Sequence, residues 1–163
     1  MERLARCLYR AAGAGVAIAL MEVLAAFAGE PLSRIPFVTS IVLVLTLPHS
    51  EASQPRAVLV GHAASCLAGL ASLLLLGAGD AASAVGVGLA GFLMLALRAP
   101  HPPAGIDAFL IAAHGLTLQW VISPVLAGCV LLLAFARGWS EGERWLFERP
   151  APGARGGGQA PAG

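Results

Sequence analysis

The ten residues from Arg98 to Asp107 read RAPHPPAGID, and apolar sequence lies on both sides of them. Proline is well tolerated at the first position of a helix, where its missing N–H group is not needed. The stretch therefore predicts that one helix ends before His101 and that another begins at Pro102 and Pro103. It also raises the question of what satisfies so many polar groups inside apolar sequence.

The composition indicates an integral membrane protein. Of the 163 residues, 58% are hydrophobic and 12% are charged, and the charged share is about half that of a typical soluble domain. So few charges cannot cover the surface of a soluble fold of this size. The net charge of +1 gives no indication of a nucleic-acid partner.

The cysteines and histidines indicate neither a disulfide framework nor a metal site. The three cysteines are an odd number without paired spacing, which gives no disulfide set and no zinc motif. The spacing of the four histidines matches no metal-binding motif either. We therefore expect no metal and no cofactor.

Four apolar segments are long enough to be transmembrane helices, and they occupy residues 11–28, 57–76, 81–97 and 120–136. The second has twenty residues without a formal charge, which matches the length needed to cross a bilayer. The first follows three arginines and ends in AFA, as a cleavable signal peptide can. Glu22 lies inside it and the later segments need an anchor, so we predict a transmembrane helix there.

Two other apolar runs are too short to cross a bilayer as regular helices. Residues 37–47 and 104–113 form runs of eleven and ten residues, about 15–17 Å as helix or half the hydrocarbon thickness. Each follows proline: Pro36 in one case, Pro102 and Pro103 in the other. The predicted fold class is an all-α membrane protein with four long transmembrane helices and two short proline-started half-helices.

The order of long, short and long segments occurs twice, in residues 11–76 and 81–136. Pro36 and Pro102 are 66 positions apart, and short interrupted segments in corresponding halves are typical of transporters built from inverted repeats. We therefore consider an inverted repeat of two three-segment units. The predicted membrane domain covers residues 11–138, between an N-terminal segment, 1–10, and a tail, 139–163, that is disordered from about residue 150.

Arginine placement and segment length favour different topologies for the short runs. If all six segments cross, one side carries Arg3, Arg6, Arg10, Arg56, Arg98 and Arg137, and the other carries only Arg34. The positive-inside rule then places both termini in the cytoplasm. The length of the short runs favours re-entrant helices instead, and that alternative stays open.

Helix N-termini at membrane depth are candidate anion sites. Their first N–H groups have no partner within the helix, and the helix dipole places about half a positive charge there. An anion satisfies both features. The residues that we expect at such a site are His101, Pro102, Pro103, Ala104, Gly105, Thr39, Ser40, Gln54, Arg56, Arg98, His62 and Asp107.

Several of these residues have plainer interpretations. Asp107 in a first helical turn can simply complement the helix dipole, and His62 can bond to a neighbouring helix. Arg56 and Arg98 can extend toward the membrane surface from the ends of helices.

The stretch RAPHPPAGIDAFL resembles the signature of the HPP family of integral membrane proteins, named for its His-Pro-Pro motif. Pro36 and Phe37, the run Gln54-Pro55-Arg56, the pair Gly61-His62 and the later SPVLAGCVLLL fit the same family. The resemblance covers roughly residues 11–136. It implies four transmembrane helices and, since some members are implicated in nitrite transport, a transport function.

We therefore expect a small membrane transporter or channel for a small inorganic anion, with nitrite suggested by the resemblance. Its expected partners are the lipid bilayer, the anion and further copies of the chain in a homo-oligomer, and its expected location is a bacterial inner membrane. One alternative is a structural or partner-binding membrane subunit. A weaker alternative is a membrane-bound enzyme that uses His101 and Asp107 as acid and base, and we expect no enzyme.

Overall fold

The computed structural model describes residues 1–28 and 37–148, and within these residues it contains helices and turns but no strand. The predicted all-α class is therefore confirmed for this part of the chain. Pro36 and the predicted disordered tail from residue 150 lie outside the described residues.

Within the described residues, three helices are long and apolar enough to cross a membrane. They are α1 (Glu2–Ala28), α3 (Pro55–Leu76) and the helical stretch Leu118–Phe147. In this stretch α6 (Leu118–Trp120) and a π-helical segment (Val121–Leu126), which is kinked where Ser123 has non-helical backbone angles, lead into α7 (Ala127–Phe147). The remaining predicted span, residues 81–97, forms α4 (Asp80–Ala96), which has only 17 residues. Four full-length spans are therefore not confirmed, and the inverted repeat stays a prediction.

The two short runs form short helices. The first is α2 (Val38–Thr46) and the second is α5 (Gly105–His114), with nine and ten residues. Pro102 and Pro103 lie in a 3₁₀ turn, Pro102–Ala104, directly before α5. The break predicted from RAPHPPAGID is thus present, and the prolines open a tight turn rather than the α-helix itself.

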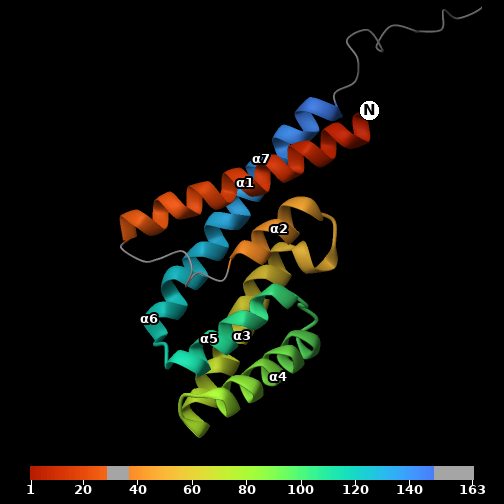
Figure 1. The fold of residues 1–163 in the computed structure, drawn as a ribbon. Coiled ribbons are helices and arrows are strands. Elements are labelled where there is room, and N and C mark those ends of the chain that lie inside the picture. Colours follow the sequence, from red (N-terminus) through yellow and green to blue (C-terminus); the bar gives the residue numbers. More distant parts are fainter. Residues whose placement is uncertain (29–36, 149–163) are drawn as a thin grey trace, which may run out of the picture.

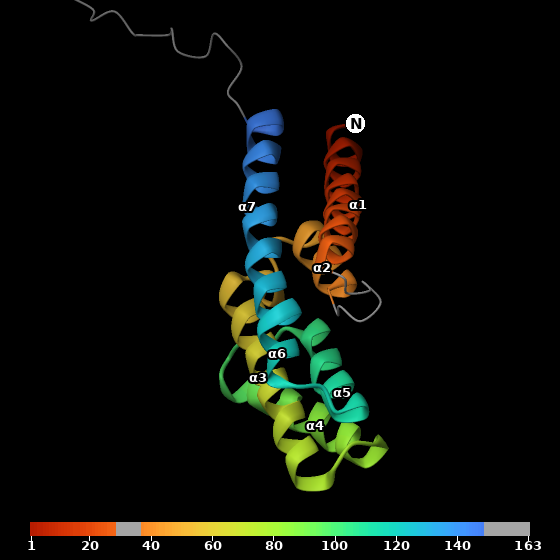
Figure 2. The ribbon, with the colours of Figure 1, turned by 90° about the vertical axis from the view of Figure 1, so that its left-hand side faces the viewer.

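Successive helices run in alternate directions along one axis of the molecule (Figure 1). Helices α3, α4 and α5 lie together at one end, while α1 and α7 extend beyond them (Figure 2). Small residues allow this close packing: a Cβ added at Gly69 of α3 would lie 2.8 Å from the Cα of Ala108 in α5. One added at Gly86 of α4 would lie 2.7 Å from the hydroxyl of Ser72.

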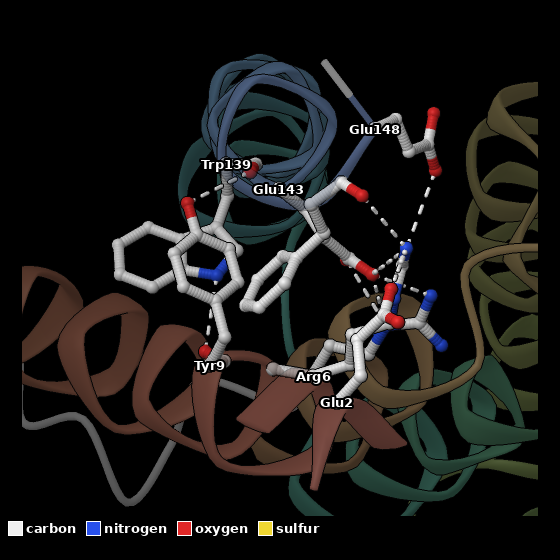
Figure 3. Close-up of polar contacts among 8 residues, drawn as sticks. Glu2, Arg6, Tyr9, Trp139, Glu143 and Glu148 are labelled. Carbon is white, nitrogen blue, oxygen red and sulfur yellow. Dashed lines mark hydrogen bonds and ion pairs between the residues drawn. The ribbon is translucent and has the colours of Figure 1, made fainter. Parts of the chain in front are cut away.

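The start of α1 and the end of α7 are joined by polar contacts (Figure 3). Arg10 donates to both carboxylate oxygens of Glu143 at 2.8–3.1 Å. The Tyr9 hydroxyl donates to the Trp139 carbonyl at 3.1 Å, and the Trp139 indole donates to the Tyr9 carbonyl at 3.2 Å. Most of the predicted N-terminal segment, and the tail as far as Phe147, are therefore helical extensions of the membrane domain.

Candidate functional site

Four polar side chains form one continuous hydrogen-bonded chain inside the molecule. A carboxylate oxygen of Asp107 lies 2.6 Å from Nδ1 of His62, and Nε2 of His62 lies 3.2 Å from the hydroxyl of Ser40. The same hydroxyl lies 3.0 Å from Nε2 of His101. Nδ1 of His101 lies 2.6 Å from the carbonyl oxygen of Ala52, where the chain ends.

All four side chains have an exposed fraction of 0%, although each comes from a different element. Asp107 lies in the first turn of α5, His62 in α3, Ser40 in the first turn of α2, and His101 directly before the 3₁₀ turn. Because no water reaches these groups, they depend on one another for hydrogen bonds. We call them the buried polar chain.

Neighbouring residues hold the two imidazoles in place. A Cβ added at Gly61 would lie 2.7 Å from the Cβ of His101, so only glycine lets His101 lie so close to α3. The ring of Phe37 is stacked on His62 with centroids 5.0 Å apart. Both histidine rings are therefore fixed by packing as well as by hydrogen bonds.

The carbonyl at the end of the chain determines which atoms donate. A carbonyl oxygen only accepts, so Nδ1 of His101 carries a proton, and Nε2 of the neutral ring accepts from the Ser40 hydroxyl. The Ser40 oxygen then accepts from Nε2–H of His62. Nδ1 of His62 and the Asp107 carboxyl group are 2.6 Å apart, and either of them can donate the proton in this hydrogen bond.

Two further residues lie against this chain. The second carboxylate oxygen of Asp107 is buried and has no hydrogen-bond partner among the described residues. The Cys66 thiol lies 3.8 Å from the first oxygen, and the Ser65 hydroxyl accepts the backbone N–H of Ala108 at 3.1 Å. Sequence analysis did not identify Cys66 and Ser65, although their spacing of four and three from His62 places all three near one face of a helix.

The start of α2 lies near the 3₁₀ turn Pro102–Ala104 that leads into α5, and residues from both helix starts border a groove of about 750 Å³. The capping residues of the two helices, Phe37 and Ala104, make no side-chain hydrogen bond to the helix start. At α5, the Gly105 amide donates to the Pro102 carbonyl and the Ala108 amide donates to Ser65. The two proline-region helix starts that the sequence singled out therefore meet in space. The groove is lined by Val38, Thr39, Val87, Pro102, Pro103, Gly105, Ile106 and Phe109.

The other predicted residues lie outside the buried polar chain, Arg56 in the first turn of α3 and Gln54 directly before it. Arg56 donates to the carbonyl oxygens of Leu97 and Arg98 at 2.7 Å each, which satisfies the C-terminal end of α4. Gln54 donates to the carbonyls of Pro48 and Ser50 within its own turn. Arg98 is exposed, and Ala104 is buried without a polar side chain.

The geometry restricts the chemistry that these groups can perform. Ser40, His62 and Asp107 are spaced like a hydrolytic triad. In a triad, however, the serine hydroxyl donates to the histidine that the carboxylate orients. Here Ser40 accepts from that histidine, His62, and is fully buried. Within residues 1–28 and 37–148, no three His, Cys, Asp or Glu side chains converge as metal ligands do. The arrangement is suited to holding and moving a proton.

Comparison with known families agrees with the motifs in this site. The family model described as "HPP, transmembrane region" matches residues 1–145. The chain belongs to the HPP family. The match includes His101, Pro102 and Pro103 and all the residues of the buried polar chain, so this HPP site lies wholly within the region that defines the family.

A transmembrane protein of Dictyostelium discoideum is 31% identical to this HPP chain over 109 residues. The aligned part covers 61% of this chain and 38% of the relative, so the chain spans well under half of that protein's length. No solved structure matches the chain.

Proposed function

We propose that this HPP-family chain transports a small inorganic anion across a membrane, with nitrite as the candidate substrate. The observation that carries the proposal is the meeting of four buried polar side chains at the point where two short helices begin. Ionisable groups inside a membrane domain are costly, and those that are kept commonly serve substrate or ion pathways.

The groove between α2 and α5 is the proposed anion site. Its helix starts supply N–H groups and the positive ends of two helix dipoles. Thr39 adds an exposed hydroxyl beside them, and Gly105 carries no side chain that would keep an anion from the backbone. The adjoining buried polar chain supplies protonatable groups next to the site.

We also propose that the protein works as a homo-oligomer in a bacterial inner membrane with both termini in the cytoplasm. We assign no enzymatic reaction to it, because Ser40 is fully buried and offers no surface to a substrate. The remaining alternative is a membrane subunit whose polar residues serve packing alone.

Nitrite entry into proteoliposomes tests the proposal. An added Cβ meets no atom within 4 Å at Gly105 or at Gly91, an exposed position on α4, so a side chain can leave the backbone at both without a clash. Gly105→Leu places a side chain in the groove and should reduce protein-dependent nitrite entry about tenfold or more. The reason is that displacing a bound group from its proper position lowers a rate by at least about that factor. Gly91→Leu, the matched control, should transport as the wild type does.

Protein-free vesicles give the background of passive entry. If purified wild-type protein adds nothing to that background for nitrite or any other small anion, the transport proposal is wrong and the packing role is favoured. If both leucine variants transport normally, the groove is not the anion site.

A further inference from the structure

An anion in the groove would lie at the same helix end as a carboxyl group. Asp107 is in the first turn of α5, and the two residues that precede it in that turn, Gly105 and Ile106, line the groove. An ionised Asp107 would repel the anion, whereas a protonated Asp107 would not. Anion binding and the protonation state of Asp107 are therefore coupled by simple electrostatics.

We propose that the anion moves together with a proton, and that the buried polar chain holds and passes that proton. This inference rests on the proposed transport function and names its coupling ion. Asp, Glu and His side chains in hydrogen-bonded series are suited to this task because each can both receive and release a proton.

The chain runs from the interior of the bundle to its edge. Its inner end is Asp107, and its outer end is the carbonyl of Ala52, in the 3₁₀ turn Glu51–Ser53. Glu51 is exposed and Ala52 is half-buried, so this end lies close to the surface of the protein. Each of the four contacts is 2.6–3.2 Å long, so protons can shift along the chain without movement of a side chain.

One proton passes along the chain in three transfers. Asp107 gives its carboxyl proton to Nδ1 of His62, His62 gives the proton on Nε2 to the Ser40 oxygen, and Ser40 gives its original hydroxyl proton to Nε2 of His101. Three bonds to hydrogen break and three form. The products are an Asp107 carboxylate, neutral His62 and Ser40, and a His101 imidazolium.

Among the described residues, the groups around the buried polar chain leave the charge of Asp107 to be balanced within the chain. The titratable groups that face the His62–Asp107 pair are His101, Cys66 on α3 and Cys129 on α7, and both thiols are buried. Among the described residues, no arginine forms an ion pair with Asp107. A charge on this carboxylate is therefore balanced by the histidines of the chain.

The transfer places positive charge next to the groove. His101 directly precedes Pro102 and Pro103, which line it. When Asp107 then takes up a proton from water, its carboxyl group is neutral again and the chain holds one added proton, on His101. An anion in the groove favours this state, because His101 is positive and Asp107 is uncharged. Thermodynamic linkage makes this effect reciprocal. If the bound proton raises the affinity for the anion by some factor, the bound anion raises the affinity for the proton by the same factor.

Simultaneous measurement of nitrite entry and internal pH tests the inference. Proteoliposomes carry trapped pyranine, and protein-free vesicles supply the passive background that is subtracted from both signals. Wild-type protein should acidify the interior in proportion to the nitrite that enters, with about one proton per anion. An imposed inward proton gradient, at a membrane potential clamped to zero, should drive nitrite above its external concentration.

Ser40→Ala breaks the chain at its centre, and Ser72→Ala is the matched control. Both serines are buried, but the Ser72 hydroxyl donates only to the Gly69 carbonyl of its own helix. Ser40→Ala should lower the protons moved per nitrite at least about tenfold, and Ser72→Ala should leave this ratio unchanged. Asp107→Asn, which cannot release a carboxyl proton, should behave as Ser40→Ala does.

The outcomes separate this inference from the function on which it rests. Protein-dependent nitrite entry without proton movement overturns proton coupling and leaves transport intact. Absence of protein-dependent entry overturns both proposals. Proton coupling that persists in Ser40→Ala assigns the proton to another route and rejects the buried chain as its carrier. The wild-type measurement decides the question even if a variant fails to fold.

Discussion

Gly61 determines how closely His101 approaches α3. The nearest atom to an added Cβ is the Cβ of His101, at 2.7 Å, and the Ala99 carbonyl oxygen follows at 3.5 Å. His101 is held from its other side by Ser40 and by Ala52. A methyl group at residue 61 therefore has no room unless the buried polar chain changes its geometry.

We expect Gly61→Ala to destabilise the protein by about 1–3 kcal/mol, the usual cost of overpacking a filled interior. Gly88→Ala is the control, because an added Cβ there meets nothing within 4 Å, and alanine in place of helical glycine is neutral or stabilising by up to about 1 kcal/mol. Thermal unfolding in detergent, followed by circular dichroism, compares the two variants. A Gly61→Ala midpoint equal to or above the wild-type value would contradict this close packing.

At the scale of the elements, α1 and α7 depend on a small set of polar contacts where they extend beyond the other helices. The side chain of Glu143 is 8% exposed and that of Arg10 is 25% exposed, and the carboxylate accepts from Arg10 at 2.8 Å. A charge-assisted pair of this kind is stronger than an exposed one. The stacked rings of Tyr9 and Trp139, 4.7 Å apart, lie beside it.

Glu143→Gln should weaken the attachment of α1 to α7 by about 2 kcal/mol, because Arg10 loses its charged partner. Glu141→Gln is the control on the same helix. Glu141 is about half exposed, and its ion pairs are with Arg137 and Arg144 of its own helix. Exposed ion pairs of this kind contribute little to stability. Since Trp139 lies at the contact, tryptophan fluorescence during unfolding follows the separation. Equal midpoints for the two variants would show that the contact does not hold the helices together.

At the scale of the whole molecule, the described helices alternate in direction along the chain, with α6 and α7 taken as one segment. The start of α1 and the end of α7 therefore lie at the same end (Figure 1). The turn between α3 and α4 lies at the opposite end. Cys7 and Asp80 are exposed residues near these two ends. Cys66 and Cys129 are buried, so a thiol reagent in water reaches them poorly.

This alternation predicts opposite labelling of the two positions. A membrane-impermeant maleimide should label Cys7 in inverted vesicles and leave it unlabelled in intact cells. Asp80→Cys in a Cys7→Ser background should give the opposite result, and Cys7→Ser alone should label from neither side. Labelling of both positions from the same side would exclude the alternation and favour re-entrant short helices.

The sequence by itself determined the class of the fold, the approximate helices and the break at His101, Pro102 and Pro103. These features are local, because in hydrocarbon each helix must satisfy its own backbone hydrogen-bonding groups. The length of an apolar segment and the position of its prolines therefore indicate where a helix begins and ends. The sequence also marked His62 and Asp107 as costly residues inside apolar segments. It did not reveal that the helix of residues 2–28 begins among the N-terminal arginines, since that extension is held by Glu143 and Trp139.

Only the tertiary structure decided which polar residues meet. The bonds of the buried polar chain join residues 22, 61, 45 and 49 positions apart, and no helical periodicity connects such distances. Packing of glycine and other small residues decides how closely helices approach, and so decides that Ser40 lies between two imidazoles. Gln54 and Arg56, at the start of α3, instead donate to backbone carbonyls. Proton positions within the chain follow from those contacts, because each donor requires an acceptor that only the packed molecule supplies.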